Sequence, residues 1–126
     1  NGDTLLDVNY RKMFAARSQA DITIAALSVE RNDRYGEIEA DENGDVVFLA
    51  CGSIETKPTI NAGVYLVRKS VLLEFKKDVF SIENDVFLDK GDLILKAYSV
   101  SGYFIDIGIP SDLERADNDV VEGIFP

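Results

Sequence analysis

The sequence contains no histidine and only one cysteine, Cys51, among its 126 residues. Without histidine, the chain cannot build a Ser-His or Cys-His catalytic pair or a histidine-ligated zinc site. A single cysteine excludes a disulfide within the chain and is typical of a reducing compartment. Any metal ion held by this chain would therefore have oxygen ligands, which favours Mg²⁺, Mn²⁺ or Ca²⁺.

Basic residues and long apolar runs are also scarce. The chain has 13 Lys and Arg against 23 Asp and Glu, which gives a formal net charge of −10. Polymeric nucleic acid is an unfavourable partner, because its affinity comes largely from Lys and Arg on phosphates. A nucleotide carried with a divalent metal is compatible with this charge. No apolar run approaches the ~18 residues of a membrane span, so we expect neither nucleic acid polymers nor membranes as partners.

The residues that are present predict one α/β domain with a mixed sheet. Apolar runs rich in β-branched residues predict strands, and Asn43-Gly44 between two apolar segments predicts a hairpin. Strands are expected at 21–29, 38–49 (the hairpin), 59–69, 93–100 and 102–107. Helices are expected after Asp7 and at 70–75, 82–89 and 111–122.

Capping residues predict where two of these helices begin. Asp7 is expected to cap the first helix, and Ser111 with Glu114 fits the S-x-x-E capping box of the last one. Gly123 is expected to end the last helix. The predicted buried stripe of that helix consists of Leu113, Ala116, Val120 and Val121.

Two of the acidic residues, Asp3 and Asp106, are the candidates for chemistry. Asp3 follows a glycine, which lets the backbone approach a ligand closely. Asp106 lies inside the apolar run "YFIDIGIP", where a carboxylate is costly unless it is paired, hydrogen-bonded or bound to a metal. Both lie near expected strand ends, where open α/β sheets bind ligands. The spacing leaves two interpretations open: a metal site, or Asp106 capping the turn that follows it.

Four segments occur in the order found in a known family: "NGD" followed by a helix, "NAGVYLV", "FSIENDVF" and "GYFIDIGIPSDLERA". The chain resembles, over nearly its whole length, the sugar-phosphate nucleotidylyltransferases, and most closely the branch with mannose-1-phosphate and heptose-1-phosphate guanylyltransferases. The resemblance implies a Rossmann-like mixed sheet of the glycosyltransferase-A type. It also implies an enzyme that joins a nucleoside triphosphate to a sugar 1-phosphate with release of pyrophosphate, in the cytoplasm, for cell-surface polysaccharide synthesis.

The resemblance also implies roles for individual residues. Asp3 and Asp106 would together hold Mg²⁺ against the α-phosphate, with the charge neutralised by the metal and by cationic side chains. The residues that would approach the sugar are Tyr35, Gly36, Asn61, Gly63 and Glu83. Each also has a simpler explanation: the glycines allow tight backbone passage, Asn61 satisfies backbone groups, and Glu83 favours the start of its helix.

The sequence departs from the family at two places. The G-x-G-T-R-L nucleotide loop, upstream of "NGD" in relatives, does not occur here, and no strand leads into Asn1. Residues 1–126 are therefore expected to be the C-terminal, sugar-binding part of a single nucleotidyltransferase domain, truncated at its N-terminus and inactive alone. The second departure concerns the Glu-Lys pair expected before the "NAG" strand. One register places Ala50-Cys51 there, and a shifted register places Glu55 and Lys57 there, with Lys57 as the nearby cation.

A different class of function fits the same departures. A relative without the loop and the Glu-Lys pair could be a non-catalytic module that binds a sugar phosphate or assembles with another subunit. The strand at 21–29 is also expected to have an exposed apolar flank. We expect a partner, such as a second copy in a homo-oligomer, to cover that edge.

Overall fold

A computed structural model describes residues 2–51, 57–74, 78–87, 89 and 91–125, without the side chains of residues 48–51. In chain order the elements are β1 (Thr4–Leu6), α1 (Tyr10–Ala16), β2 (Ile22–Ser28), β3 (Gly36–Ala40), β4 (Val46–Cys51), β5 (Thr59–Val67), α2 (Lys69–Glu74), the single-turn π-helix η1 (Ile82–Phe87), β6 (Leu95–Val100), β7 (Phe104–Asp106) and α3 (Pro110–Val121). The predicted mixture of strands and helices is confirmed.

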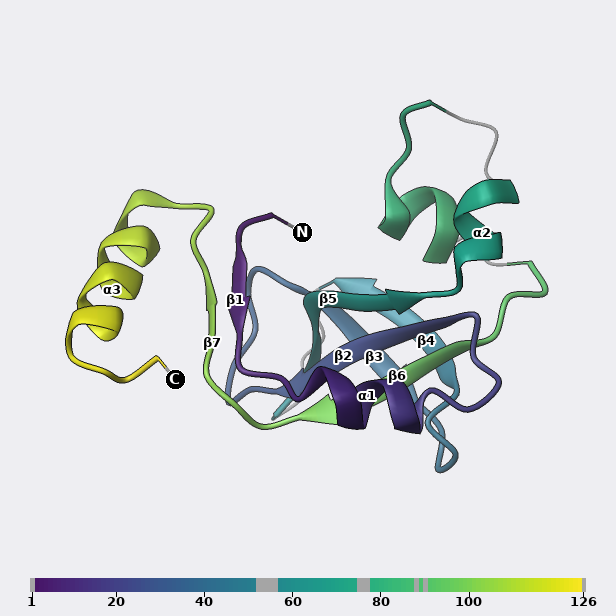
Figure 1. Cartoon of the computed structure of the whole chain (residues 1–126), viewed down its shortest axis with the longest axis horizontal. Coiled ribbons are helices and arrows are strands. Elements are labelled where there is room, and N and C mark those ends of the chain that lie inside the picture. The colour runs from purple at the N-terminus through teal and green to yellow at the C-terminus, as the bar shows by residue number, and fades with distance from the viewer. Residues whose placement is uncertain (1, 52–56, 75–77, 88, 90, 126) are drawn as a thin grey trace.

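The main sheet has five strands in the order β4-β3-β5-β2-β6. Its β2–β6 pair is parallel and the pairs of β3 with β4, β3 with β5 and β2 with β5 are antiparallel, so the sheet is mixed as predicted. A separate two-stranded sheet pairs β1 with β7, and it stands with α3 to one side of the main sheet (Figure 1). The chain thus divides into a covered sheet and a smaller β1–β7–α3 group.

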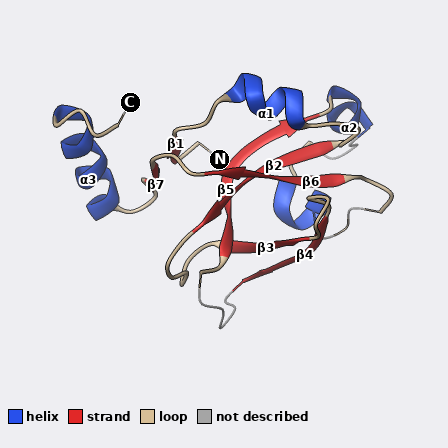
Figure 2. Cartoon of the chain, turned by 90° about the horizontal axis from the view of Figure 1, so that it is seen from below, coloured by secondary structure: helices blue, strands red, loops and turns tan. Residues whose placement is uncertain are grey.

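Strand β2, which lies between β5 and β6, is buried on both faces. Ile22, Ile24 and Ala26 join one hydrophobic cluster with Val71 of α2 and Val86 of η1. The alternate residue Ala25 joins a second cluster with Met13 of α1 and Ala62 of β5. Successive side chains of a strand point to opposite faces, which explains why this strand is apolar without alternation. Figure 2 shows α1 lying along one face of the sheet.

The hairpin between β3 and β4 ends in the expected Asn-Gly turn. The Asp41 carboxylate accepts hydrogen bonds from the backbone N–H groups of Asn43 and Asp45, and Gly44 has a φ of +78°. The turn then contacts β6, because Lys96 Nζ lies 3.1 Å from Asp45 Oδ2 and the N–H of Ala97 donates to the Gly44 carbonyl. This contact curls the sheet.

The structure corrects the position of strand β2. Residues 21–29 were expected to leave an apolar flank exposed, but β2 lies between β5 and β6 and pairs with both along most of its length. The prediction was wrong because the later strand 95–100 returns to pair in parallel with β2. Coverage of a sheet edge by a second copy of the chain stays a prediction.

The caps predicted for the first and last helices were wrong. Asn9, rather than Asp7, caps α1, and its side chain accepts a hydrogen bond from the Lys12 N–H. Helix α3 begins at Pro110 with Ile109 at the N-cap and no side-chain cap, so Ser111 lies inside the first turn. A proline at the first helical position suffices because its missing N–H would have had no helical partner. Gly123 follows the end of α3 as expected, with a φ of +71°.

The apolar stripe of α3 is largely uncovered. Ala116 is buried, but Leu113 is 46%, Val120 55% and Val121 86% exposed. The predicted buried stripe is therefore wrong for three of its four residues. The spacing identified an apolar face, but β7 is the element that α3 contacts most within the described chain.

Candidate functional site

Antiparallel pairing of β1 with β7 brings Asp3 and Asp106 together. Thr4 is the register partner of Asp106, and the N–H of Ile107 donates to the Asp3 carbonyl at 2.8 Å. A Cβ added at Gly108 would lie 2.9 Å from Asp106 Oδ1 and 3.5 Å from Asp3 Oδ2. The two carboxylates therefore face the same small space beside Gly108, and the absence of a side chain there leaves that space open.

Asp106 also stabilises the turn after β7. Its Oδ1 accepts a hydrogen bond from the N–H of Gly108 at 2.8 Å and lies 3.6 Å from Nη2 of Arg34. The interpretation that Asp106 caps the turn after it is thus correct. It leaves the metal interpretation open, because a carboxylate can accept several interactions through its two oxygens.

The donor set at this position fits Mg²⁺. This ion is usually held by one or two carboxylates together with substrate phosphates and water, and Asp3 and Asp106 supply two carboxylates around an open space. Within the described ranges, no group of three or more His, Cys, Asp or Glu residues could hold a metal alone. A bound ion would therefore need further oxygen ligands from a substrate or from water.

Arg34 joins this site although the sequence gave it no role. Its Nη1 lies 2.6 Å from Asp112 Oδ2 at the start of α3, and its Nη2 faces Asp106. The hydrogen bond to Asp112 is the main cause that raises the pKa of Arg34. The arginine directly precedes Tyr35-Gly36, and this adjacency was the only signal in the sequence.

A second group of predicted residues gathers on β5 and η1. Nδ2 of Asn61 donates to Tyr65 Oη at 3.0 Å and to Glu83 Oε1 at 3.1 Å, and the Tyr65 hydroxyl donates to Glu83 Oε1 at 3.3 Å. Burial is the main cause that raises the pKa of Tyr65 to about 12. Tyr65 was not predicted, although its position four residues after Asn61 places both on one strand.

Gly63 shapes the backbone between these residues. The register of β5 against β2 shifts between the pairs Ile24–Tyr65 and Ala26–Asn61, and Gly63 in this irregularity has a φ of +71°. The Asn61 side chain accepts a hydrogen bond from the Gly63 N–H at 3.0 Å. The simpler explanations for Asn61 and Gly63 therefore hold, and Asn61 carries the contact to Glu83 in addition.

Tyr35, Gly36 and Lys57 have separate surroundings. The Tyr35 ring packs edge-on against Phe104 of β7 at 5.4 Å, which places it beside the Asp106 strand, and Gly36 begins β3. Lys57 is 67% exposed at its side chain and pairs with Glu30 at 3.3 Å. The competing registers for the Glu-Lys pair cannot be compared, since Glu55 and the side chains of Ala50 and Cys51 lie outside the described residues.

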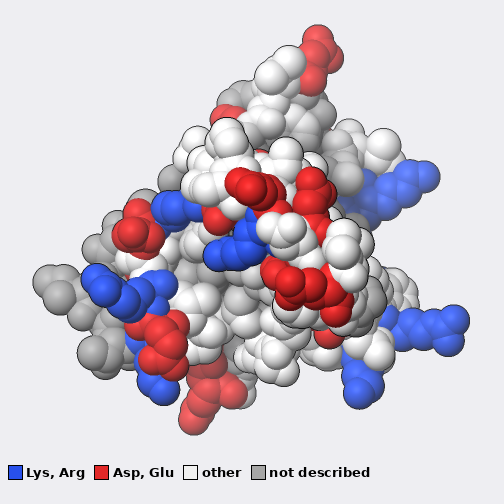
Figure 3. Space-filling model, turned by 90° about the vertical axis from the view of Figure 1, so that its left-hand side faces the viewer, with Lys and Arg blue, Asp and Glu red and all other residues white. Residues whose placement is uncertain are grey.

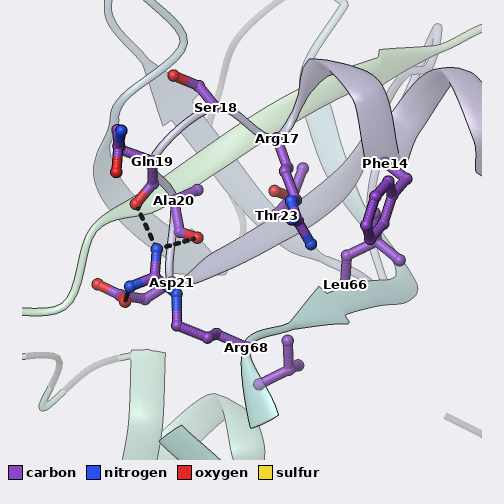
Figure 4. A pocket seen from close by; sticks show the side chains of 10 residues that line it. Phe14, Arg17, Ser18, Gln19, Ala20, Asp21, Thr23, Leu66 and Arg68 are labelled. Carbon is purple, nitrogen blue, oxygen red and sulfur yellow. Dashed lines mark hydrogen bonds and ion pairs between the residues drawn. The ribbon is translucent and has the colours of Figure 1, made fainter. Parts of the chain in front are cut away.

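A hollow of about 340 Å³ lies elsewhere, between the end of α1 and the end of β5 (Figure 4). Arg68 spans part of it, because it pairs with Asp21 at 3.3 Å and donates to the Gln19 carbonyl. Arg17 lies over the Phe14 ring at 3.8 Å. This hollow is at the opposite end of β2 from Asn61, since Ile22 pairs with Val67. Its lining includes none of the predicted site residues, so it is not their site.

The face that carries α3 has many charged side chains of both signs. Figure 3 shows Asp and Glu side chains on this side of the molecule with Lys and Arg side chains among them. Asp3, Asp106 and Asp112 all belong to the β1–β7–α3 group, and Arg34 contacts both Asp106 and Asp112. Such a site attracts cations and needs them before it can accept an anionic substrate.

The chain is similar in sequence to named guanylyltransferases. It is 37% identical over 125 residues to a D-glycero-alpha-D-manno-heptose 1-phosphate guanylyltransferase from Aneurinibacillus thermoaerophilus, with 95% of this chain and 54% of the relative covered. A mannose-1-phosphate guanylyltransferase from Mycobacterium tuberculosis is 33% identical over 135 residues, with 100% of this chain and 37% of the relative covered. The chain spans about half the length, or less, of these curated relatives. No family model matches it.

Solved structures agree with the sequence relatives. HddC from Yersinia pseudotuberculosis, in complex with GMP-PN, superposes with a TM-score of 0.82 at 32% identity, with 95% of this chain and 53% of HddC covered. A putative glucose-1-phosphate thymidylyltransferase from Bacillus anthracis superposes with a TM-score of 0.65 at 21% identity and shows the fold alone. The predicted nucleotide-diphospho-sugar transferase type of fold is confirmed. No helix in the described part of the chain is long and apolar enough to cross a membrane.

Proposed function

Because the chain is homologous to sugar-phosphate nucleotidylyltransferases over nearly its whole length, we propose that it forms the sugar-phosphate side of such an enzyme. The protein would join a nucleoside triphosphate to a sugar 1-phosphate and release pyrophosphate. GTP is the proposed nucleotide, because two relatives are named guanylyltransferases and HddC was solved with GMP-PN. A manno-configured sugar 1-phosphate is the proposed acceptor, since both relatives' names contain one.

The observation that carries this proposal is the convergence of Asp3 and Asp106 beside Gly108. In the proposed reaction an oxygen of the sugar phosphate attacks the α-phosphorus of the nucleotide, a new P–O bond forms, and the bond to the pyrophosphate breaks. No protein nucleophile is needed, which agrees with a chain without histidine. Mg²⁺, when bound by Asp3 and Asp106, would neutralise charge on the phosphates.

The protein groups would act by position. Asp3 and Asp106 are fixed by the β1–β7 ladder, and Asn61, Tyr65 and Glu83 offer a polar cluster for sugar hydroxyls. Hydrogen-bonding groups held in place before the substrate arrives lower the entropy cost of binding it. Gly36 directly follows Tyr35, and the N–H of Gly63 donates to the Asn61 side chain.

We expect Asp3→Asn and Asp106→Asn to abolish pyrophosphate release. Each change replaces one charged carboxylate ligand of the proposed Mg²⁺ ion with a neutral amide of nearly the same shape. The assay would use the whole protein that contains this chain, with Mg²⁺, GTP and either mannose 1-phosphate or the heptose 1-phosphate. Asp117→Asn, on the exposed surface of α3, is the matched control.

Full turnover by both Asp3→Asn and Asp106→Asn would contradict the metal assignment. The alternative function, a non-catalytic module that binds a sugar phosphate or assembles with a subunit, predicts a different outcome. It predicts that the unmodified protein binds the sugar phosphate but does not catalyse the release of pyrophosphate from the nucleotide. The same protein and substrates therefore separate the two functions.

A further inference from the structure

The proposed site is rich in negative charge, which repels anionic substrates. Asp3, Asp106 and Asp112 lie together in the β1–β7–α3 group, and the proposed substrates are themselves anionic phosphates. A metal ion held by two carboxylates offsets only part of this charge. A phosphate bound next to Asp106 therefore needs a cationic side chain of the protein close by.

Lys57, the cation that the sequence indicated, is directed elsewhere. Its ammonium pairs with Glu30 at 3.3 Å, and both side chains are largely exposed. An exposed pair of this kind adds little to binding or stability. Within the residues that the structure describes, no hydrogen bond or ion pair joins Lys57 to Asp3, Asp106 or the Asn61–Glu83 cluster.

Arg34 has the geometry that Lys57 lacks. Asp112 anchors its Nη1 at 2.6 Å, whereas its Nη2 stands 3.6 Å from Asp106 Oδ1, which is longer than a hydrogen bond. A guanidinium carries five N–H donors in a rigid fork. Asp112 thus holds the group by one end, and the other end faces the proposed metal carboxylate with donors to spare. The side chain is 35% exposed, so a ligand can reach it.

The backbone around Arg34 is fixed in advance. The Asn32 side-chain oxygen accepts hydrogen bonds from the N–H groups of Arg34 and Tyr35, at 3.2 and 2.8 Å. The Asn32 amide nitrogen donates to the Tyr35 carbonyl and to the side chain of Glu37, the buried second residue of β3. A binding side chain supported in this way loses less freedom when its ligand arrives.

We propose that Arg34, anchored by Asp112, binds the phosphate group of the sugar 1-phosphate beside Asp106. This inference rests on the proposed function and deepens it, since it names the cation for the acceptor phosphate. The planar guanidinium suits a phosphate because two of its N–H groups can bind two oxygens at once. Asp112 would act as a positioning residue that keeps the fork turned towards Asp106.

The test compares Arg34→Gln with Arg115→Gln in the whole protein. Arg115 is the matched control because it also pairs with Asp112, at 3.8 Å, but is 60% exposed on α3 and, among the residues that the structure describes, forms no ion pair with Asp106. Steady-state kinetics would give KM separately for GTP and for the sugar 1-phosphate. Calorimetric titration with mannose 1-phosphate, and with mannose as the probe without phosphate, would give affinities without turnover. Thermal unfolding would check the fold.

We expect Arg34→Gln to weaken binding of the sugar 1-phosphate about tenfold to a hundredfold, as loss of a charged hydrogen bond usually does. The KM for GTP, the weak binding of mannose and the melting temperature should stay close to those of Arg115→Gln. Arg34→Lys should restore part of the affinity, because it keeps the charge but loses the fork.

Three outcomes would overturn the inference. Arg34→Gln could match Arg115→Gln in every measurement, it could weaken GTP and the sugar phosphate equally, or it could lose its fold. If Asp106→Asn loses turnover while Arg34→Gln binds the sugar 1-phosphate normally, only the role of Arg34 is contradicted. Full turnover in Asp106→Asn would instead remove the proposed metal site, and the role of Arg34 with it.

Discussion

Tyr65 illustrates how a single residue links burial to the candidate site. Its hydroxyl donates to the Glu83 carboxylate and accepts from Asn61, and its ring packs edge-on against Phe87 at 5.2 Å. Burial and the negative charge of Glu83 both oppose ionisation of the hydroxyl, and the pKa of Tyr65 therefore rises to about 12, with burial the larger cause. The residue stays a hydrogen-bond donor throughout the physiological range.

We expect Tyr65→Phe to change how stability depends on alkaline pH. In the unfolded chain a tyrosine ionises near pH 10, whereas folded Tyr65 ionises near 12. The contribution of this residue to the free energy of unfolding is therefore fully present below pH 10 and is lost between about 10 and 12. The unmodified protein should lose stability more steeply across that window than Tyr65→Phe.

Denaturant unfolding at a series of pH values from 9 to 12 would measure this difference. Tyr10→Phe, at a tyrosine that is 56% exposed on α1, is the control and should follow the unmodified protein. Equal slopes for Tyr65→Phe and the unmodified protein would contradict the assignment.

Among the elements, the β1–β7 pair matters most for the site. It has only three register pairs, from Thr4–Asp106 to Leu6–Phe104, and it is extended by the hydrogen bond from the Asp7 N–H to the Tyr103 carbonyl. Next to this bond, Gly102 passes so close to Asp7 that a Cβ added there would lie 2.4 Å from the Asp7 carbonyl oxygen. Residue 102 must therefore lack a side chain, because the Asp7 carbonyl oxygen is a backbone atom and cannot move aside as a side chain can.

We expect Gly102→Ala to destabilise the protein by about 1–3 kcal/mol, the usual cost of forcing extra atoms into a packed position. Because β1 must then move away from β7, binding of Mg²⁺ with nucleotide should weaken as well. Urea unfolding would measure the first effect and calorimetric titration the second. Gly2→Ala, where an added Cβ meets nothing within 4 Å, is the matched control for the unfolding measurement. A Gly102→Ala variant as stable as Gly2→Ala would contradict the close passage.

At the scale of the whole molecule, the net charge of −10 is the dominant property. Acidic side chains outnumber basic ones in the chain, so their mutual repulsion opposes folding. Salt screens such repulsion, and the screening length falls from about 30 Å at 0.01 M to about 8 Å at 0.15 M ionic strength.

We expect the melting temperature to rise as NaCl increases from about 10 to 150 mM, the range over which screening changes most. At equal ionic strength, Mg²⁺ should raise it further, because an ion bound by Asp3 and Asp106 stabilises the folded state. Calorimetric scans of the unmodified protein and of Asp106→Asn would test both parts. A Mg²⁺ effect that persists unchanged in Asp106→Asn would contradict binding at this pair.

The sequence by itself determined the elements that a local pattern specifies. Continuous apolar residues at 22–28 gave a strand buried on both faces, and Asn43-Gly44 gave the hairpin turn. The four quoted segments identified the fold. Local patterns failed at the caps of α1 and α3, where Asn9 and Ile109 stand at the N-cap instead of Asp7 and Ser111. They also missed β1, because a three-residue strand is too short to show a period.

Only the tertiary structure decided which groups meet. Asp3 and Asp106 are far apart in the chain, and antiparallel pairing of β1 with β7 brings them to Gly108. Tyr65 and Arg34 entered the candidate site because β5 lies next to η1 and because the segment before β3 reaches the start of α3. The physical reason is that ion pairs and hydrogen bonds depend on distances of a few ångströms across the fold. Spacing along the sequence fixes such distances only within one helix or strand.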